Sequence, residues 1–340
     1  MALASKTVIF IIDRDIYFKF YSTIINEFLV RGFMVFLAHN HVNSRFPLSN
    51  KSLSFPSLSK APQFGIDKTY QRSFIFKKID ELITKINNEK IEYVFSLHSR
   101  SYYSIDKNTI PSSKWVTLQH WADNFVSEHA LKKDILDCDY LCMYSKIWWN
   151  GFLKSKFSNN IAKSSKFPKI LFHGNPYHDT FENFDNNQIR EKYGIDLSKR
   201  IVLYIPLGFG GNHLQTFSEK VWSHYYNQTN KYPKFLLSLY AKFLRSKITE
   251  VDLIKKMQAF CKDNDAILVI KGRVKKPIPQ DVERLCDNVI YDETFYPSTI
   301  CELISVSSLV ISHFSMTIFD VINHGVFNIN IEFNKIGHLQ

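Results

Sequence analysis

Long apolar runs are missing from this sequence of 340 residues. No stretch approaches the roughly 18 to 20 uncharged apolar residues that a membrane-spanning helix requires. The first apolar run, Thr7–Ile12, ends in charged residues. It lacks both the longer apolar region and the small-residue cleavage site of a secretory signal. The run therefore predicts a buried first strand of a globular protein.

Cysteine is scarce, with five residues at positions 138, 142, 261, 286 and 301. An odd number without metal-ligand spacing argues against a disulfide framework and against a zinc site, and it favours a reducing compartment. Cys138 and Cys142 stand in one apolar run and are expected to be buried thiols.

Acidic residues are outnumbered, since 32 Asp and Glu face 43 Lys and Arg and leave a formal charge of +11. This excess favours anionic partners such as nucleotides, phosphates or an anionic membrane face. The 29 Phe and 17 Tyr residues are also suited to stacking on nucleic-acid bases. The basic charge is dispersed and no recognition motif accompanies the rings, so they are interpreted as core residues and no nucleic-acid partner is expected.

Short apolar runs alternate with helix-length stretches, which predicts an α/β fold with parallel sheets. Loops are expected over Ser44–Pro62 and Phe209–Lys231. Helices are expected over Tyr17–Val30, Tyr70–Asn88, Ile147–Phe157, Phe235–Cys261, Ser298–Val306 and Met316–Asn323. Further strands are expected at Met34–Ala38, Glu92–Leu97, Trp115–Gln119, Tyr140–Tyr144, Lys169–Phe172, Ile201–Ile205, Ile267–Lys271, Val289–Tyr291, Leu309–Ser312 and Phe327–Ile331.

The alternation weakens between Thr180 and Lys199, where Asn, Asp and Lys dominate. Because the length exceeds one ordinary core, we expect two α/β domains, residues 1–185 and 186–340. The last predicted strand leaves little chain for a helix to cover the sheet edge. Two explanations stay open: the cover comes from elsewhere, or the natural protein continues past Gln340.

Nucleotide motifs rich in glycine are absent. The first strand is followed by Asp13-Arg14-Asp15, not by G-x-G-x-x-G, and no P-loop occurs. This argues against a nicotinamide or flavin dehydrogenase and against a P-loop nucleotidase. Asp13 and Asp15 are interpreted as turn and cap residues.

Polar residues follow several predicted strands, where ligands bind in open α/β sheets. His120 and Asp123 come after Trp115–Gln119, and a histidine there is suited to act as a general base. A purely structural histidine is the alternative. Gly174 and Asn175 open a rigid turn after Lys169–Phe172, which is either a ligand loop or a plain hinge.

The strongest pattern follows Leu309–Ser312. His313, Ser315 and Thr317 lead into a helix that contains Asp320. Hydroxyl groups and free amides at a helix start favour phosphate, and a simple N-cap role is compatible with that.

Two cations follow another strand of the same half. Lys271 and Arg273 would complete a diphosphate pocket with the hydroxyl groups after Leu309–Ser312. The alternative for them is a solvated basic loop.

Together these motifs resemble a known superfamily over about residues 90 to 333. Their order is H-x-x-D, G-N-P-x-x-D, Y-x-P, K-x-R and I-S-x-F-S-x-T-x-x-D. The order is similar to that of GT-B glycosyltransferases, and more narrowly of the bacterial CDP-glycerol glycerophosphotransferase and surface-carbohydrate biosynthesis family. The chain departs from that family at several positions. Trp121 replaces a Gly, Tyr177 an Arg, Arg273 a His and His313 an Asp, and Met316 replaces the second Ser.

The resemblance implies two Rossmann-like domains facing a central cleft, with the acceptor held by residues 1–185 and the donor nucleotide by 186–340. It implies a metal-independent transferase without a cofactor. This enzyme would move a sugar or polyol-phosphate unit from a CDP-, CMP- or UDP-linked donor to a glycan or lipid-linked acceptor in surface polysaccharide biosynthesis. His120 and Asp123 would be catalytic. The donor would meet Gly174, Asn175, Lys271, Arg273, Glu293, His313, Ser315, Thr317 and Asp320.

Two other functions remain open: a UDP-sugar 2-epimerase-like enzyme and a catalytically degenerate GT-B binding module. We expect a cytoplasmic protein. The stretch Ser145–His173 carries six Lys residues and no acid, with Trp148, Trp149 and Phe152 among them. It suits either an anionic membrane surface, which would place the protein at the inner face of the plasma membrane, or an ordinary solvated helix.

Overall fold

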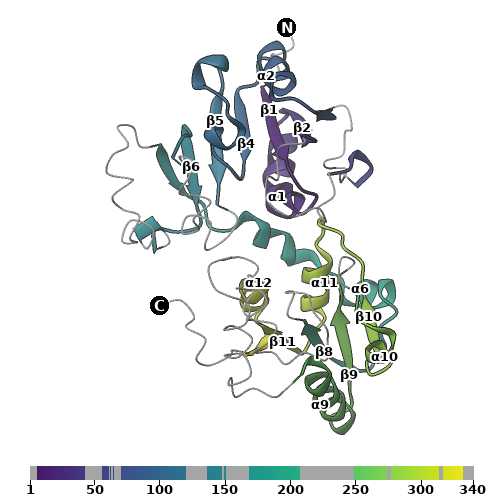
Figure 1. Ribbon diagram of the computed structural model, residues 1–340. Helices are drawn as coiled ribbons and strands as arrows, with labels where there is room; N and C mark the ends of the chain where they lie inside the picture. Colours follow the sequence, from purple (N-terminus) through teal and green to yellow (C-terminus); the bar gives the residue numbers. More distant parts are fainter. Residues whose placement is uncertain are drawn as a thin grey trace, which may run out of the picture. The chain divides into compact units, whose positions relative to one another are not determined.

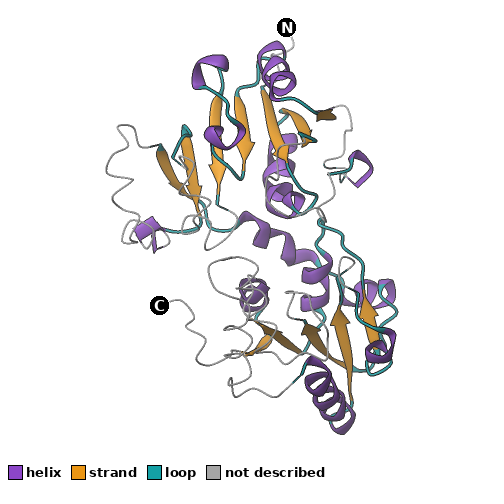
Figure 2. Ribbon diagram, in the orientation of Figure 1, coloured by secondary structure: helices purple, strands orange, loops and turns teal. Residues whose placement is uncertain are grey.

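In the computed structural model the chain divides into two compact units, Met1–Thr180 and Phe181–Gln340 (Figure 1). The structure describes residues 6–42, 56–60, 62, 64, 70–119, 136–147, 149–150, 168–206, 249–273, 277–313 and 317–331. Figure 2 shows strands running side by side within each unit and helices packed along them.

The described part of the first unit holds a sheet with the strand order β3-β2-β1-β4-β5-β6-β7. Every pairing in it is parallel. The strands are β1 (Thr7–Ile12), β2 (Met34–Asn40), β3 (Gln71–Phe76), β4 (Tyr93–Ser96), β5 (Lys114–Leu118), β6 (Tyr140–Met143) and β7 (Lys169–Phe172). The helices are α1 (Tyr17–Val30) and α2 (Ile79–Asn88), with short 3-10 turns η2 (Leu58–Lys60), η4 (Arg100–Tyr103), η5 (Lys107–Thr109) and η6 (Pro176–Asn183).

The centre of this sheet is covered on both faces, as parallel strands require. Residues 8–12 of β1 are all buried, and the Trp115 side chain of β5 has no exposed surface. The α1 helix crosses β1, where the Tyr21 hydroxyl donates to the Ile11 carbonyl at 3.2 Å. The chain then leaves α1 through Gly32, whose φ of +76° is accessible to glycine at little cost.

The second unit, as described, has a parallel sheet with the order β10-β9-β8-β11-β12. Its strands are β8 (Arg200–Ile205), β9 (Ala266–Lys271), β10 (Asn288–Ile290), β11 (Leu309–His313) and β12 (Phe327–Ile331). Its helices are α6 (Asn186–Lys192), α9 (Glu250–Asp263), α10 (Gln280–Glu283), α11 (Thr299–Ser305) and α12 (Thr317–Asn323). One apolar core joins a sheet face to α6, α11 and α12, and another joins the opposite face to α9 and α10.

These observations confirm the predicted α/β class and its parallel sheets. The strands predicted at Thr7–Ile12, Lys169–Phe172 and Phe327–Ile331 and the helix at Tyr17–Val30 have the predicted bounds. Cys138 and Cys142 are buried thiols, as expected, and burial raises the pKa of each to about 12.

The helix predicted over Tyr70–Asn88 is wrong in its first half. Gln71–Phe76 forms the strand β3, and Lys78 is extended before α2 begins at Ile79. Strand β3 pairs with β2 along its whole length, for example Ser73 with Leu37. This pairing with a distant segment overrides the local pattern of the sequence.

The long helix predicted over Phe235–Cys261 is not continuous, and residues 235–248 of it lie outside the described residues. Thr249 has an extended backbone, with φ −92° and ψ 166°, and it caps α9. The Thr249 hydroxyl accepts from the Asp252 amide at 3.1 Å, and the Asp252 carboxylate accepts from the Thr249 amide at 2.9 Å. This reciprocal cap fixes a helix start inside the predicted helix.

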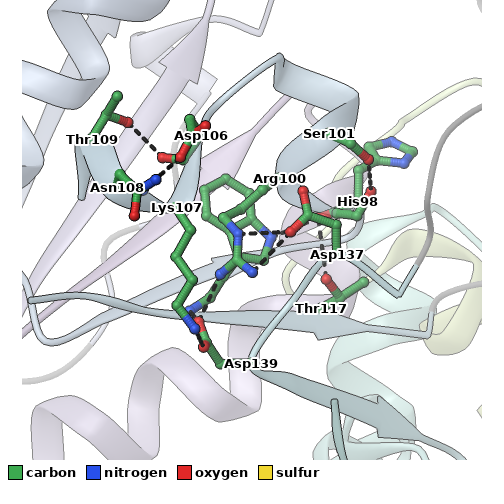
Figure 3. A network of polar contacts seen from close by, with 12 residues as sticks. His98, Arg100, Ser101, Asp106, Lys107, Asn108, Thr109, Thr117, Asp137 and Asp139 are labelled. Atoms are coloured by element: carbon green, nitrogen blue, oxygen red, sulfur yellow. Dashed lines mark hydrogen bonds and ion pairs between the residues drawn. The ribbon is translucent and has the colours of Figure 1, made fainter. Parts of the chain in front are cut away.

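A buried ion cluster holds the connection between β4 and β5 against the start of β6 (Figure 3). The Arg100 side chain, 5% exposed, contacts Asp137 at 2.8 Å and Asp139 at 2.7 Å. Burial works to raise the pKa of Asp139. Hydrogen bonds from Lys107, the Trp115 amide and Arg100 outweigh that effect and leave the pKa below its ordinary value. Ionised Asp139 therefore contributes to the free energy of unfolding. The contribution is complete above the pKa of an aspartate in the unfolded chain, and it is lost as the pH falls through the lower pKa of Asp139 in the folded protein.

Replacing Arg100 with Met should lower the free energy of unfolding by about 3 to 5 kcal/mol, because two carboxylates lose their buried partner. Urea denaturation followed by tryptophan fluorescence measures this change. Arg31→Met is the matched control, since Arg31 pairs with Glu27 on the surface of α1 at side-chain exposures of 68% and 59%. That control should cost no more than about 1 kcal/mol. Equal effects of the two substitutions would contradict the assigned role of Arg100.

Candidate functional site

Successive strands are added first to one side of each sheet and then to the other, so each sheet has one switch point where the order reverses. In the first unit this lies between β1 and β4, and in the second between β8 and β11. Ligands of open parallel sheets bind outside the carboxyl ends of the strands at such a point. The residues that follow these strands are therefore the first candidates for a site.

Asp13 directly follows β1 and is 1% exposed. Its carboxylate accepts a hydrogen bond from the Asn40 amide at 2.7 Å and another from the Tyr103 hydroxyl at 2.7 Å. The interpretation of Asp13 as a helix cap is wrong, because α1 has no side-chain cap hydrogen bond. Asp13 is instead the buried acceptor that joins the ends of β1 and β2 to η4.

His98 lies beside this carboxylate, two residues after β4. Its Nε2 is 3.9 Å from Asp13 Oδ2 and 3.1 Å from the Tyr17 hydroxyl. The imidazole ring stacks on Tyr102 with centroids 3.9 Å apart and an interplanar angle of 15°. Its side chain remains 26% exposed. The ring is thus held in one orientation and still reaches the surface.

This arrangement suits acid–base chemistry. A carboxylate 3.9 Å from the ring stabilises the positive charge that an imidazole acquires when it accepts a proton. Sequence reasoning did not single out His98. Its position directly after a predicted strand was the available signal, but the pairing with Asp13 joins residues 85 positions apart and becomes visible only in the fold.

Of the predicted residues of the first unit, only Gly174 and Asn175 are described, and they lie apart from this pair. His120 and Asp123 lie outside the described residues. Gly174, with φ +71°, and Asn175 follow β7. The Asn175 amide lies 3.2 Å from His178 Nε2. Since β7 is three strands from β4, about 14 Å at ordinary strand spacing, Gly174 and Asn175 do not join the Asp13–His98 pair within the sheet.

In the second unit, Lys271 ends β9 and Arg273 follows it closely. Lys271 Nζ donates to the Gly272 carbonyl at 2.7 Å. Burial lowers the pKa of Lys271 below its ordinary value, while the carboxylates of Glu293 and Asp292 act in the opposite direction. Burial also lowers the pKa of Arg273, and the Glu293 carboxylate again acts to raise it. The structure therefore brings the predicted residues Lys271, Arg273 and Glu293 together.

Gly272 stands between the two cations, and the Tyr291 ring packed against it leaves no room for a side chain. A Cβ atom at this position would lie 2.4 Å from the Tyr291 ring. The ring is fixed in turn, because its hydroxyl donates to Glu283 and accepts from the Ile278 amide at 2.9 Å. Tyr291 thus determines the path of the backbone that carries Lys271 and Arg273.

The other predicted residues of this unit lie at β11 and α12. His313 is 3% exposed, and its Nε2 is 3.0 Å from the Tyr204 hydroxyl. Asp320, also 3% exposed, lies in the first turn of α12, which begins at Thr317. Ser315 lies outside the described residues.

Two features are absent from the residues that the structure describes. No group of three or more His, Cys, Asp or Glu side chains there is placed to hold a metal ion. Within the same residues, none of the helices is both long and apolar enough to cross a membrane.

No family model and no curated protein matches the sequence. Solved structures do match the fold. UGT89C1 of Arabidopsis thaliana, in complex with UDP-L-rhamnose, aligns with a TM-score of 0.50 and 10% identity over 96% of this chain and 79% of that chain. The wall teichoic acid polymerase TagF aligns with a TM-score of 0.51 and 12% identity over 96% of this chain and 69% of the TagF chain. A putative UDP-N-acetylglucosamine 2-epimerase from Listeria monocytogenes aligns with a TM-score of 0.52 and 10% identity. That alignment covers 96% of this chain and 79% of the epimerase chain.

Identities this low establish the fold alone. The two Rossmann-like units of this chain have the fold of GT-B glycosyltransferases. This confirms the fold that the sequence motifs indicated.

Replacing Gly272 with Ala should lower the free energy of unfolding by about 1 to 3 kcal/mol, because the new methyl group overlaps the Tyr291 ring. Adding Tyr291→Ala tests the cause through a double-mutant cycle. In the Tyr291→Ala background the Gly272→Ala step should cost less than about 0.5 kcal/mol. An unchanged cost in that background would show that the ring is not what excludes a side chain.

Proposed function

We propose that this protein is a transferase that moves a sugar or polyol-phosphate unit from a nucleotide-activated donor to a glycan or lipid-linked acceptor. The observation that carries the proposal is the pair of cations at the carboxyl end of β9, Lys271 and Arg273. They stand at the sheet edge where an open α/β sheet binds its ligand.

The second unit, within residues 186–340, is assigned to the donor. Lys271 and Arg273 would bind the diphosphate by charge-assisted hydrogen bonds. Thr317, with the predicted Ser315 and Asp320, would contact the donor from the β11 side of the switch point between β8 and β11. Glu293, whose charge acts on both cations, would accept a hydrogen bond from the ribose or base.

The first unit, within residues 1–185, is assigned to the acceptor. An acceptor hydroxyl oxygen would attack the transferred group while its proton passes to a histidine. The bond between the transferred group and the phosphate of the departing nucleotide breaks, and its electron pair stays on the oxygen of that leaving phosphate. The Asp13–His98 pair supports His98 as the base, because the carboxylate stabilises the imidazolium that forms. His120, with Asp123, remains the prediction from the sequence motifs.

The similar structures support a nucleotide-linked donor, since UGT89C1 was solved with UDP-L-rhamnose. TagF, named as a wall teichoic acid polymerase, supports a place in surface polysaccharide biosynthesis. On this proposal the protein does not need a metal ion. It would act in the cytoplasm at the inner face of the plasma membrane, where Ser145–His173 would contact anionic lipid.

The similarity to a putative 2-epimerase favours one second candidate. An epimerase would convert a UDP-sugar without any acceptor, whereas a transferase would at most hydrolyse it slowly. Incubation of the protein with UDP-N-acetylglucosamine alone, followed by sugar analysis, separates these two activities.

A thermal-shift panel of CDP, CMP, UDP, GDP and ADP should reveal one or two nucleotides that stabilise the protein. Lys271→Met should weaken binding of that nucleotide by about tenfold or more, because a charge-assisted contact to phosphate is lost. Lys255→Met, on the exposed side of α9, is the control and should bind normally. If none of the five nucleotides binds, or if both variants bind equally well, the donor assignment fails.

His98→Asn should lower kcat by a factor of about 10² to 10⁴ and leave nucleotide affinity within about twofold, because only proton transfer is lost. His120→Ala is the competing variant, and His324→Asn in the second unit is the control. Transfer assays with all three variants name the base. Full activity of His98→Asn together with complete loss in His120→Ala would move the role to His120.

A further inference from the structure

We infer that Tyr204 and Glu250 are positioning residues that fix the His313 ring beside the donor-phosphate edge of the second unit. This inference rests on the proposed donor site formed by Lys271 and Arg273. It assigns a role to Glu250, which no motif of the sequence singled out, and to Tyr204, which the sequence offered only as the tyrosine of the Y-x-P motif.

The three side chains form a buried hydrogen-bonded row. Tyr204 is 0% exposed, Glu250 is 1% exposed and His313 is 3% exposed. The Tyr204 hydroxyl lies 3.0 Å from Glu250 Oε1 and 3.0 Å from His313 Nε2. The Tyr204 and His313 rings meet edge to face, with centroids 5.8 Å apart.

The chemistry of the groups sets the direction of the row. An ionised carboxylate only accepts hydrogen bonds, so the single hydroxyl proton of Tyr204 goes to Glu250. The Tyr204 oxygen then accepts from Nε2–H of His313. The row therefore selects the Nε2–H form of His313 and holds its ring in one orientation.

The position of Glu250 in the fold favours its role as a hydrogen-bond acceptor. Glu250 is the first residue of α9, a helix of 14 residues whose N-terminus favours negative charge. Burial, followed by the nearby Glu250 charge, raises the pKa of Tyr204 above its ordinary value, so the hydroxyl keeps its proton and stays a donor.

Stability alone does not account for this row. Tyr204 packs in the apolar core between the sheet and α9, among Ile270 and Ile311. Apolar residues of similar volume would fill that space without burying a carboxylate and an imidazole. A fully bonded polar row instead gives one defined ring orientation.

The row ends where the donor site begins. Tyr204 pairs with Ile311 in the parallel register of β8 and β11, and His313 is the last residue of β11. Lys271 ends β9 two strands away, about 10 Å at ordinary strand spacing. Because His313 is only 3% exposed, it acts on the donor by fixing the end of β11 and not by direct contact.

Isothermal titration with the nucleotide found in the thermal-shift panel tests the inference. Tyr204→Phe keeps the ring and removes the hydroxyl, so nucleotide affinity should fall about tenfold. Ser307→Ala is the matched control in the same unit. It removes a buried hydroxyl that donates to the Leu303 carbonyl at 2.6 Å before β11 begins, at the opposite end of that strand from His313. This variant should bind within about twofold of the wild type. Circular dichroism confirms that each variant is folded.

A second readout does not depend on nucleotide. Long-range ¹H–¹⁵N spectra of histidine-labelled protein should show the Nε2–H form of His313 in the wild type and a mixture of forms in Tyr204→Phe. His313→Gln identifies the signal. A folded Tyr204→Phe variant that binds nucleotide like the wild type would overturn the inference and leave the proposed function intact. Failure of the wild type to bind any nucleotide would overturn the proposed function, and this inference with it.

Discussion

Parallel strand pairing is the constraint on which the rest of this structure depends. Every pairing described in both sheets is parallel, so the carboxyl ends of all strands in a sheet lie along one edge. Residues far apart in the sequence meet there. Asp13 reaches His98 by this route, and Tyr204 reaches His313. The residues of both candidate sites stand at this edge, while the strands themselves are largely apolar.

The two edges differ in charge and in burial. At the edge of the first unit a buried carboxylate is satisfied by Asn40 and Tyr103, and a partly exposed imidazole lies against it. The second edge carries the cations Lys271 and Arg273, whose backbone path is set by the Tyr291 ring over Gly272. The first set of groups supports the proposed proton transfer, and the second set supports the proposed phosphate binding.

Much of the fold could be predicted from local sequence. The β-branched and aromatic runs of β1, β7 and β12 and the helical spacing of α1 gave bounds that the structure reproduces. The errors have identifiable causes. Strand β3 forms because β2 offers it a partner, and the capping box at Thr249 starts α9 where the apolar pattern alone suggested a continuing helix.

The candidate site was predictable only where its residues are close in sequence. Lys271 and Arg273 stand out because both follow one strand directly. The role of Asp13 was misread, because a carboxylate after a strand resembles a cap until Asn40 and Tyr103 are seen to bond it. Glu250 gave no local signal, since it begins a helix. Tyr204 appeared only as the tyrosine of Y-x-P near the end of an apolar strand, and that motif assigned it no role.

Photoaffinity labelling tests the central claim, that a nucleoside diphosphate binds at the carboxyl edge of the second sheet. The protein would be irradiated with 5-azido-UDP, or with the azido form of whichever nucleotide stabilises it, and the labelled peptide identified by mass spectrometry. The account predicts label within residues 249–331, close to Lys271–Arg273 or to Glu293, and its loss when unmodified nucleotide competes. Competable label confined to residues 6–180 would contradict it.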